Sequence, residues 1–438
     1  MTKGSESSQP DRLRRQFLRA ALVTGGLATA SILLGEQSSV KQVMALSSTS
    51  TTILDQPSTL RQGASYVILN NLEPPNVQAV NMSSGSVDFS DPDASLVIQQ
   101  AIDALPNGGR IFANAGEYSL TRSIKLADNL EIAGEGDATI FHCPPNSQAF
   151  ISTDPESNQI NVDQTTGNWL KGTGGNTGVY LHDFTIVGNE TPRQIGIVLV
   201  YSNQCTVERV SMTDLGVNSY PSYSDYMDFD GCGVDIDKSQ DCIVRDVQIM
   251  RPGTTGVMIQ DTSYGNGQHN TRNTVTSSDI DGGTSCVFGV HIINASDCTI
   301  SYNTIRHCEG IQDQGGGGVY LECMSNEFST DHNSIVGNVL NDNALTAQAW
   351  YNGGLMISSY CQENAAVRNS FSNNGNKSAG HGCNLGVNGD HNIVAFNVSL
   401  DVNNSDIFVQ SNGTDNVFMR NQNKAFFQDP AATGNLIL

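Results

Sequence analysis

From Gly196 onward the chain repeats a pattern of eight residues in which the second and fourth positions are always apolar. The pattern recurs at intervals of 23 to 37 residues, beginning at Gly196, Gly233, Gly256, Gly289, Gly318, Gly354, Gly382 and Asp406. Alternation with a period of two predicts short strands with one buried face. The third and fifth positions vary freely, so we expect them to face outward.

A second repeat follows each of these segments and begins with cysteine or asparagine. Its first positions are Cys205, Cys242, Asn273, Cys298, Asn333, Asn364, Asn392 and Asn416, and later copies add Asn303, Asn338, Asn369, Asn397 and Asn421 five residues on. Equivalent residues in successive coils stack, which predicts asparagine ladders because an amide both donates and accepts. Cysteine fits the same positions as a small buried residue. A Cys205–Cys242 disulfide is the open alternative, since neighbouring strands lie about 4.8 Å apart.

Short strands at regular intervals predict an all-β parallel solenoid in a single chain, with one coil per repeat. Upstream of the repeats, one segment has helical periodicity. Apolar residues recur on one helical face from Asp93 to Leu105. We expect this short helix to cover the open N-terminal end of the solenoid.

The first 45 residues have the features of an export signal. Arg14 and Arg15 lie before an apolar run, Ala20 to Leu34, that is too short to span a bilayer comfortably. The arginine pair resembles a twin-arginine signal, with cleavage expected after Ala45. An uncleaved amphipathic anchor is the alternative. The predicted organisation is a signal peptide at 1–45, a linker and lead-in at 46–87, and the solenoid domain at 88–438.

Charge excludes two classes of partner. The 438 residues carry a net charge of −22 and contain no basic stripe beyond the N-terminal arginines. Nucleic acid and anionic membrane surfaces are therefore not expected to bind. We expect an exported monomer that is periplasmic, extracellular or on the cell surface, with no membrane contact once the signal is removed. No C-x-x-C pair occurs, so a zinc site is not expected.

The segment from Ile98 to Tyr118, I-Q-Q-A-I-D-A-L-P-N-G-G-R-I-F-A-N-A-G-E-Y, is similar to the start of right-handed β-helix proteins of the pectate lyase superfamily. That superfamily includes pectate lyases, polygalacturonases, mannuronan C5-epimerases and tailspike-type proteins. The resemblance covers roughly residues 88 to 430. It implies a right-handed parallel β-helix that binds a polysaccharide along its outward face, and it leaves the reaction open because this fold hosts several chemistries.

Ionisable side chains concentrate at outward positions of the middle coils. The predicted catalytic residues are Asp235, Asp237, His291, Tyr320 and Glu322, which we expect to line one groove. Aromatic faces suit the C–H faces of sugars, so the predicted substrate-binding residues are Tyr223, Tyr226, Trp350 and Tyr351, together with Gln260. Acidic oxygens suit Ca²⁺, and the candidate ligands are Asp228, Asp230, Asp235 and Asp237.

The favoured activity is β-elimination or C5 epimerisation of a uronic-acid polysaccharide, with His291 as the base and Tyr320 as the proton donor. A polygalacturonase-type glycoside hydrolase using Asp235 and Asp237 is the first alternative. A non-catalytic glycan-binding or structural solenoid is the second. Family motifs match only in part, because Ile236 and Asp237 replace the Pro-His of the epimerases.

Overall fold

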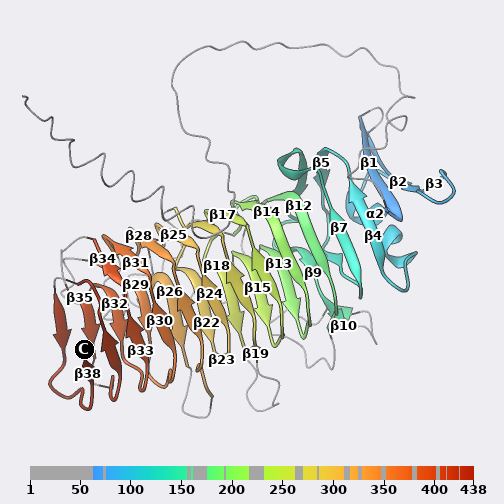
Figure 1. Ribbon diagram of the computed structural model, residues 1–438. Coiled ribbons are helices and arrows are strands. Elements are labelled where there is room, and N and C mark those ends of the chain that lie inside the picture. Colours follow the sequence, from blue (N-terminus) through green and yellow to red (C-terminus); the bar gives the residue numbers. More distant parts are fainter. Residues whose placement is uncertain are drawn as a thin grey trace, which may run out of the picture. The chain divides into compact units, whose positions relative to one another are not determined.

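The computed structural model describes residues 63–72, 75–154, 159–160, 175–191, 194–216, 231–261, 270–283, 286–309, 316–323, 328–346, 352–376, 382–400, 405–410, 412–423 and 425–438. The predicted signal peptide and most of the linker lie outside these ranges. The described strands stack coil upon coil into a right-handed parallel β-helix (Figure 1). No helix in the described residues is long and apolar enough to cross a bilayer.

One face of the β-helix is a sheet of eleven parallel strands, one from each coil. Its strands are β6 (Ile124–Lys125), β9 (Gln148–Ile151), β13 (Ile195–Val200), β15 (Cys232–Asp237), β18 (Thr255–Gln260), β22 (Phe288–Ile293), β26 (Gly316–Glu322), β29 (Asn352–Ile357), β32 (Cys383–Val387), β35 (Ser405–Val409) and β37 (Phe426–Gln428). All but the first two and the last correspond to the eight-residue repeats. The repeats therefore form one sheet, as the sequence predicts.

The remaining strands of the coils form two further rows of paired strands, which we call the first and second ladders. Strands β12 and β14 pair with strands of both ladders and so join them into one sheet. The first ladder contains β4 (Gly109–Ala113), β7 (Leu130–Ala133), β12 (Tyr180–Val187), β14 (Thr206–Thr213), β16 (Ile243–Arg245), β20 (Thr274–Thr276), β24 (Thr299–Ser301), β27 (Ser334–Val336), β30 (Ala365–Val367), β33 (Ile393–Ala395), β36 (Val417–Met419) and β38 (Leu436–Ile437). The second contains β5 (Gly116–Ser119), β8 (Thr139–His142), β17 (Gln248–Met250), β21 (Asp279–Asp281), β25 (Thr304–Arg306), β28 (Val339–Asn341), β31 (Ser370–Ser372) and β34 (Val398–Ser399).

The N-terminal part differs from the coils because its strands are partly antiparallel. There β1 (Tyr66–Leu72), β2 (Pro75–Asn81) and β3 (Val87–Asp91) precede helix α2 (Ala94–Asp103). The helix begins where the Asp93 carboxylate accepts from the Ser95 backbone N–H at 2.9 Å, a common N-cap. Its buried face includes Val97, Ile98 and Ile102, so the predicted amphipathic helix is present. Short elements complete the chain: η2 (Gly136–Ala138), β10 (Thr153–Asp154), β11 (Gln159–Ile160), β19 (Asn270–Thr271) and β23 (Ala295–Ser296).

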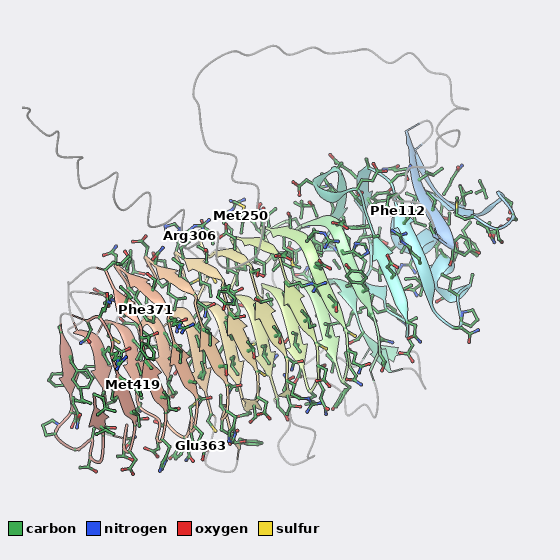
Figure 2. The ribbon with its side chains drawn as sticks, in the orientation of Figure 1. Phe112, Met250, Arg306, Glu363, Phe371 and Met419 are labelled. Atoms are coloured by element: carbon green, nitrogen blue, oxygen red, sulfur yellow. The ribbon has the colours of Figure 1, made fainter. Side chains whose placement is uncertain are left out.

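The core runs along the solenoid axis and is filled by the second and fourth positions of each repeat. Val234, Ile236, Val290, Ile292, Val319 and Leu321 are all 0% exposed. Side chains of the other ladders meet them, such as Phe371 of β31, whereas Met250 of β17 is 45% exposed (Figure 2). The glycine that opens six of the repeats, those from Gly196 to Gly354, also faces the core. A Cβ on Gly233 would lie 2.8 Å from Ile249 Cδ1, which leaves no room for a larger residue.

One predicted register is wrong. Leu355 pairs with Leu385 and Met356 with Gly386, so the repeat assigned to Gly382 begins instead at residue 384. Asn384 is therefore an interior residue, and its Oδ1 accepts from Asn374 Nδ2 at 2.9 Å. The error arises because Cys383 precedes Leu385 and Val387 at the same two-residue spacing. The alternation is therefore equally good in either register.

Asparagine ladders form as predicted. Asn338 Nδ2 donates to Asn369 Oδ1 at 3.0 Å, and the same contact joins Asn333 to Asn364. The Cys298 backbone N–H donates to Asn333 Oδ1 at 2.9 Å, so cysteine does occupy the same type of position. A third ladder, which the sequence did not reveal, contains Asn343, Asn374 and Asn384.

All ten cysteines are free thiols and are buried, so the alternative of a Cys205–Cys242 disulfide is not realised. The two thiols nevertheless interact. A hydrogen bond with Cys205, together with burial, raises the pKa of Cys242 well above its ordinary value. A thiol held in its neutral form is a poor nucleophile, so Cys242 acts as a core residue.

Candidate functional site

The outward side chains of the eleven-stranded sheet form what we call the outer face. Its central row, in the order of the coils, is Val198, Asp235, Met258, His291, Tyr320, Met356, Gly386 and Phe408. A second row lies just before each repeat and includes Cys232, Thr255, Phe288 and Cys383. This second row faces outward because the residue that follows it faces inward, a glycine in most coils and Asn384 after Cys383.

The predicted catalytic residues all lie on this face, on strands β15, β22 and β26, with Gln260 on the intervening β18. Asp235, Asp237 and Gln260 are 0% exposed, and His291 is 2% exposed. The side chains are thus withdrawn from solvent, whereas the sequence led us to expect an open groove. Only Tyr320 and Glu322 are partly exposed.

Asp235 and Gln260 form a buried polar pair. Gln260 Nε2 lies 3.1 Å from Asp235 Oδ1 and 3.3 Å from Oδ2, so one amide donates to a single carboxylate. Such a bond offsets part of the cost of burying the acid. Among the described residues, no group of three or more His, Cys, Asp or Glu side chains is arranged to hold a metal ion. A Ca²⁺ site would depend on Asp228 and Asp230, which lie outside the described residues.

His291 lies between a carboxylate and two aromatic rings. Its Nε2 is 2.9 Å from Glu322 Oε2 on the neighbouring strand. Its ring centroid is 4.2 Å from that of Phe288 and 5.2 Å from that of Tyr320. Phe288 and Tyr320 stack at 5.1 Å with an interplanar angle of 10°. The carboxylate fixes the orientation of the imidazole, the arrangement that an acid–base histidine needs.

Four of the predicted substrate-binding residues are aromatic. Tyr223, Tyr226, Trp350 and Tyr351 all lie outside the described residues.

A contact between two sulfur atoms lies two coils beyond His291 and involves none of the predicted site residues. Met356 Sδ of β29 is 3.9 Å from Cys383 Sγ of β32, and both residues are 1% exposed. Burial raises the pKa of Cys383 to about 12. The sequence did not reveal this contact because the incorrect register placed Cys383 among the inward positions.

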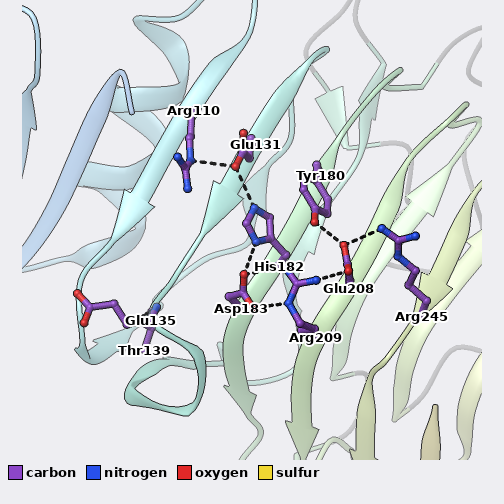
Figure 3. Close-up of polar contacts among 10 residues, drawn as sticks. All are labelled: Arg110, Glu131, Glu135, Thr139, Tyr180, His182, Asp183, Glu208, Arg209 and Arg245. Atoms are coloured by element: carbon purple, nitrogen blue, oxygen red, sulfur yellow. Dashed lines mark hydrogen bonds and ion pairs between the residues drawn. The ribbon is translucent and has the colours of Figure 1, made fainter. Parts of the chain in front are cut away.

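A second polar cluster lies on the first ladder, outside the predicted site (Figure 3). His182 Nε2 is 2.9 Å from Glu131 Oε1, and its Nδ1 is 2.6 Å from Asp183 Oδ2. Arg209 Nε donates to Asp183 Oδ1 at 2.6 Å. Burial opposes ionisation of Asp183, but hydrogen bonds from Arg209 and His182 outweigh it and lower the pKa of that carboxyl.

The same cluster continues across the next two strands. Tyr180 donates its hydroxyl to Glu208, and Arg245 Nη2 donates to the same carboxylate at 2.9 Å. Burial and the hydrogen bond to Glu208 raise the pKa of Tyr180, so the phenol stays protonated. At the N-terminal end Arg110 Nε lies 2.9 Å from Glu131 Oε1. The acidic and basic groups pair with one another, so the cluster ties coils together.

The chain matches a known protein family. A family model described as "Periplasmic copper-binding protein (NosD)" matches residues 152–388, more than half of the chain. The chain belongs to this family. No curated protein is similar to the chain in sequence.

Solved structures show the same fold at low identity. The A-module of mannuronan C-5 epimerase AlgE4 from Azotobacter vinelandii is 15% identical, with a TM-score of 0.50 over 80% of this chain and 94% of that one. PfbA, a surface adhesin of Streptococcus pneumoniae, is 14% identical, with a TM-score of 0.53 over 78% and 87%. The tailspike protein of E. coli bacteriophage HK620, as a mutant, is 13% identical, with a TM-score of 0.50 over 81% and 62%. These NosD-family and β-helix relationships establish the predicted fold.

Proposed function

We propose that this NosD-family chain binds copper in its reduced form, Cu(I), outside the cytoplasm. The donors would be the soft side chains of the outer face. The support comes from the family description as periplasmic copper-binding and from the chemistry of this face. Thioether and thiolate sulfur are the ligands that favour Cu(I), whereas carboxylates favour hard cations.

The observation that carries the proposal is the contact of Met356 with Cys383. Two sulfur atoms 3.9 Å apart, both withdrawn from water, form a donor set that fits Cu(I), which accepts as few as two ligands. Further soft or borderline donors lie on the same face, namely Cys232, Met258 and His291. The carboxylate of Asp235 is already engaged by Gln260. When bound, Cu(I) would be a cargo held by sulfur, and the chain would hold it away from water and oxidants.

The test is a titration of the reduced, folded protein against a chromophoric Cu(I) chelator without oxygen. We expect the protein to withdraw copper from the chelator, and Ca²⁺ and Mg²⁺ not to bind. A folded protein that withdraws no copper would refute the proposal.

A second candidate function is modification of a uronic-acid polysaccharide, and the His291–Glu322 pair beside Tyr320 favours it. His291 would accept the C5 proton, Tyr320 would donate a proton to the leaving oxygen or the opposite face, and Asp235 and Asp237, or Ca²⁺ with them, would neutralise the uronate. A mannuronan epimerase among the solved neighbours has the same fold. The burial of His291 means that the outer face would have to open before a polymer could reach it.

Incubation with alginate and pectate, with and without Ca²⁺, separates the enzymatic alternatives. Rising ultraviolet absorbance indicates a lyase, new reducing ends without absorbance indicate the hydrolase alternative, and a changed uronate composition indicates an epimerase. We expect His291→Ala to lose about 10²–10⁴-fold in rate if the histidine is the base. Binding without turnover would support the non-catalytic solenoid.

We further propose that the N-terminal residues direct export by the twin-arginine route, and that α2 closes the N-terminal end of the solenoid. Lysine at both Arg14 and Arg15 should block export, because the receptor recognises the arginine pair. Unchanged export of that variant would point to the general secretory route.

A further inference from the structure

Two neighbouring strands bring one thioether and one thiol together on the outer face. Strand β29 carries Met356 and strand β32 carries Cys383, and the strands pair directly, with Gly353 opposite Cys383 and Met356 opposite Gly386. The two sulfur atoms therefore lie across adjacent coils, 3.9 Å apart. The contact holds together positions 27 residues apart in the sequence.

Two glycines make room for this contact. A Cβ on Gly386 would lie 2.4 Å from Met356 Cε, 2.7 Å from Met356 Sδ and 3.2 Å from Cys383 Sγ. A Cβ on Gly353 would lie 3.2 Å from the same thioether sulfur. Any side chain at residue 386 would therefore push Met356 away from Cys383. The backbone conformation does not require glycine there, since Gly386 has no positive φ. The close approach of Met356 is the reason for glycine at this position.

The surroundings of the two sulfur atoms are apolar. Phe408 and the partly exposed Tyr320 pack against them in one cluster. Cys383 Sγ also lies 3.8 Å from the Asn352 carbonyl oxygen. Met356 and Cys383 are each 1% exposed, so water has little access to the two sulfur atoms. A metal that binds sulfur strongly can replace the thiol proton.

We propose that Met356 Sδ and Cys383 Sγ are the ligands of a single Cu(I) ion. This inference rests on the proposed copper-binding function and names its site. Sulfur is the donor type that Cu(I) favours, and the two sulfur atoms, 3.9 Å apart, would both be within reach of one ion. On binding, the S–H bond breaks, a Cu–S bond forms and the proton leaves to solvent. No electron is transferred, because the ion arrives and stays as Cu(I).

The experiment compares Met356→Leu with Met212→Leu. Both changes remove one buried thioether, but Met212 lies in the interior of the solenoid, away from Cys383. Copper is added as Cu(I) under anaerobic conditions, and affinity is measured by competition with a chromophoric chelator. Removal of an outer-shell partner of a metal commonly costs 10- to 100-fold in affinity, so loss of a ligand is expected to cost at least about 100-fold.

We expect Met356→Leu to lose at least about 100-fold in Cu(I) affinity and Met212→Leu to bind as the wild type does. Gly386→Ala, which displaces the thioether without removing it, should also weaken binding. Circular dichroism and thermal unfolding check that each variant is folded. If the wild type binds Cu(I) and Met356→Leu binds equally well, the two sulfurs only pack together and the inference is wrong, while the proposed function stands. If the wild type binds no Cu(I), both are wrong.

Discussion

The interior of the solenoid and its outer face are built from the same strands, yet they follow different rules. Inside, one type of residue recurs coil after coil, as in the ladder that joins Asn338 to Asn369. Outside, the central row changes at every coil, from Asp235 through Met258 and His291 to Tyr320. Within a ladder, each asparagine side chain bonds to the next in the same way. On the outer face the partners differ, as Gln260 bonds to Asp235 and Glu322 to His291.

This contrast between interior and outer face separates the residues that stabilise the fold from those that could bind a ligand. A coil is stable when its interior matches the coils on both sides, so substitutions there affect every neighbour. The outer face is also buried at its centre, but it holds its polar groups in separate pairs, such as Asp235 with Gln260. We therefore expect interior substitutions to reduce stability, and outer-face substitutions at the sulfur pair to reduce binding.

The largest expected effect is that of a charge placed in the interior. Ile292→Asp should lower the free energy of unfolding by about 4 kcal/mol or more, because the carboxylate would be buried without a partner. Urea unfolding followed by circular dichroism measures the change. The control is Val339→Asp at a position that is 37% exposed, where a change within about 0.5 kcal/mol is expected. Equal effects at the two positions would contradict the assignment of inside and outside.

Interruption of an asparagine ladder should have the next largest effect. Asn338 accepts from the backbone N–H and Nδ2 of Asn303, and it donates to Ile300 O and Asn369 Oδ1. Asn338→Ala leaves buried donors and acceptors unpaired, each costing about 1–3 kcal/mol, so a loss of about 2–4 kcal/mol is expected. The same urea measurement applies. A loss below about 0.5 kcal/mol would mean that the ladder adds nothing to the stacking of apolar side chains.

The polar cluster on the first ladder should have a smaller, pH-dependent effect. Asp183 is partly exposed, so loss of its pair with Arg209 in Asp183→Asn should cost about 1 kcal/mol or less at neutral pH. Its pKa is lowered in the folded state, so the contribution is present above the unfolded value, about 3.9. It is lost as the pH falls through the folded pKa. Thermal unfolding of both proteins between pH 7 and pH 2 should show the difference disappearing in acid. A difference that persists unchanged would rule out the ion pair as its source.

The smallest expected effect on stability is that of Met356→Leu. The two side chains have similar volume, so the free energy of unfolding should change by less than about 1.5 kcal/mol. Cu(I) affinity should nevertheless fall, which separates the outer face from the interior most clearly. A large loss of stability in this variant would place Met356 with the structural residues instead.

The sequence predicted the interior better than the outer face, and the reason is physical. Stacked positions such as Asn333 and Asn364 require the same residue type in each coil, so the repeat is visible without a structure. Cysteine was also recognised, because Cys298 takes the same place in the stack. Where Cys383, Leu385 and Val387 alternate, apolar spacing alone could not choose between two registers.

Contacts on the outer face depend on side-chain direction, which the pattern does not contain. Spacing placed Asp235 and His291 outward, but it could not show that Gln260 bonds to Asp235 or that Glu322 orients His291. The outward row that holds Cys383 precedes the inward residue at the start of each repeat, which is Asn384 in this coil. Gly386 lies opposite Met356 and leaves room for the sulfur contact. This role of the glycine can be recognised only once the pairing of the strands is known.

The most direct test of a copper site on the outer face is X-ray absorption at the copper edge of the Cu(I)-loaded protein. We expect an edge typical of Cu(I) and sulfur neighbours at about 2.3 Å, a usual metal–sulfur distance. Those sulfur neighbours should decrease in Met356→Leu and be unchanged in Met212→Leu. A first shell of nitrogen or oxygen alone, or a spectrum identical in Met356→Leu, would contradict it.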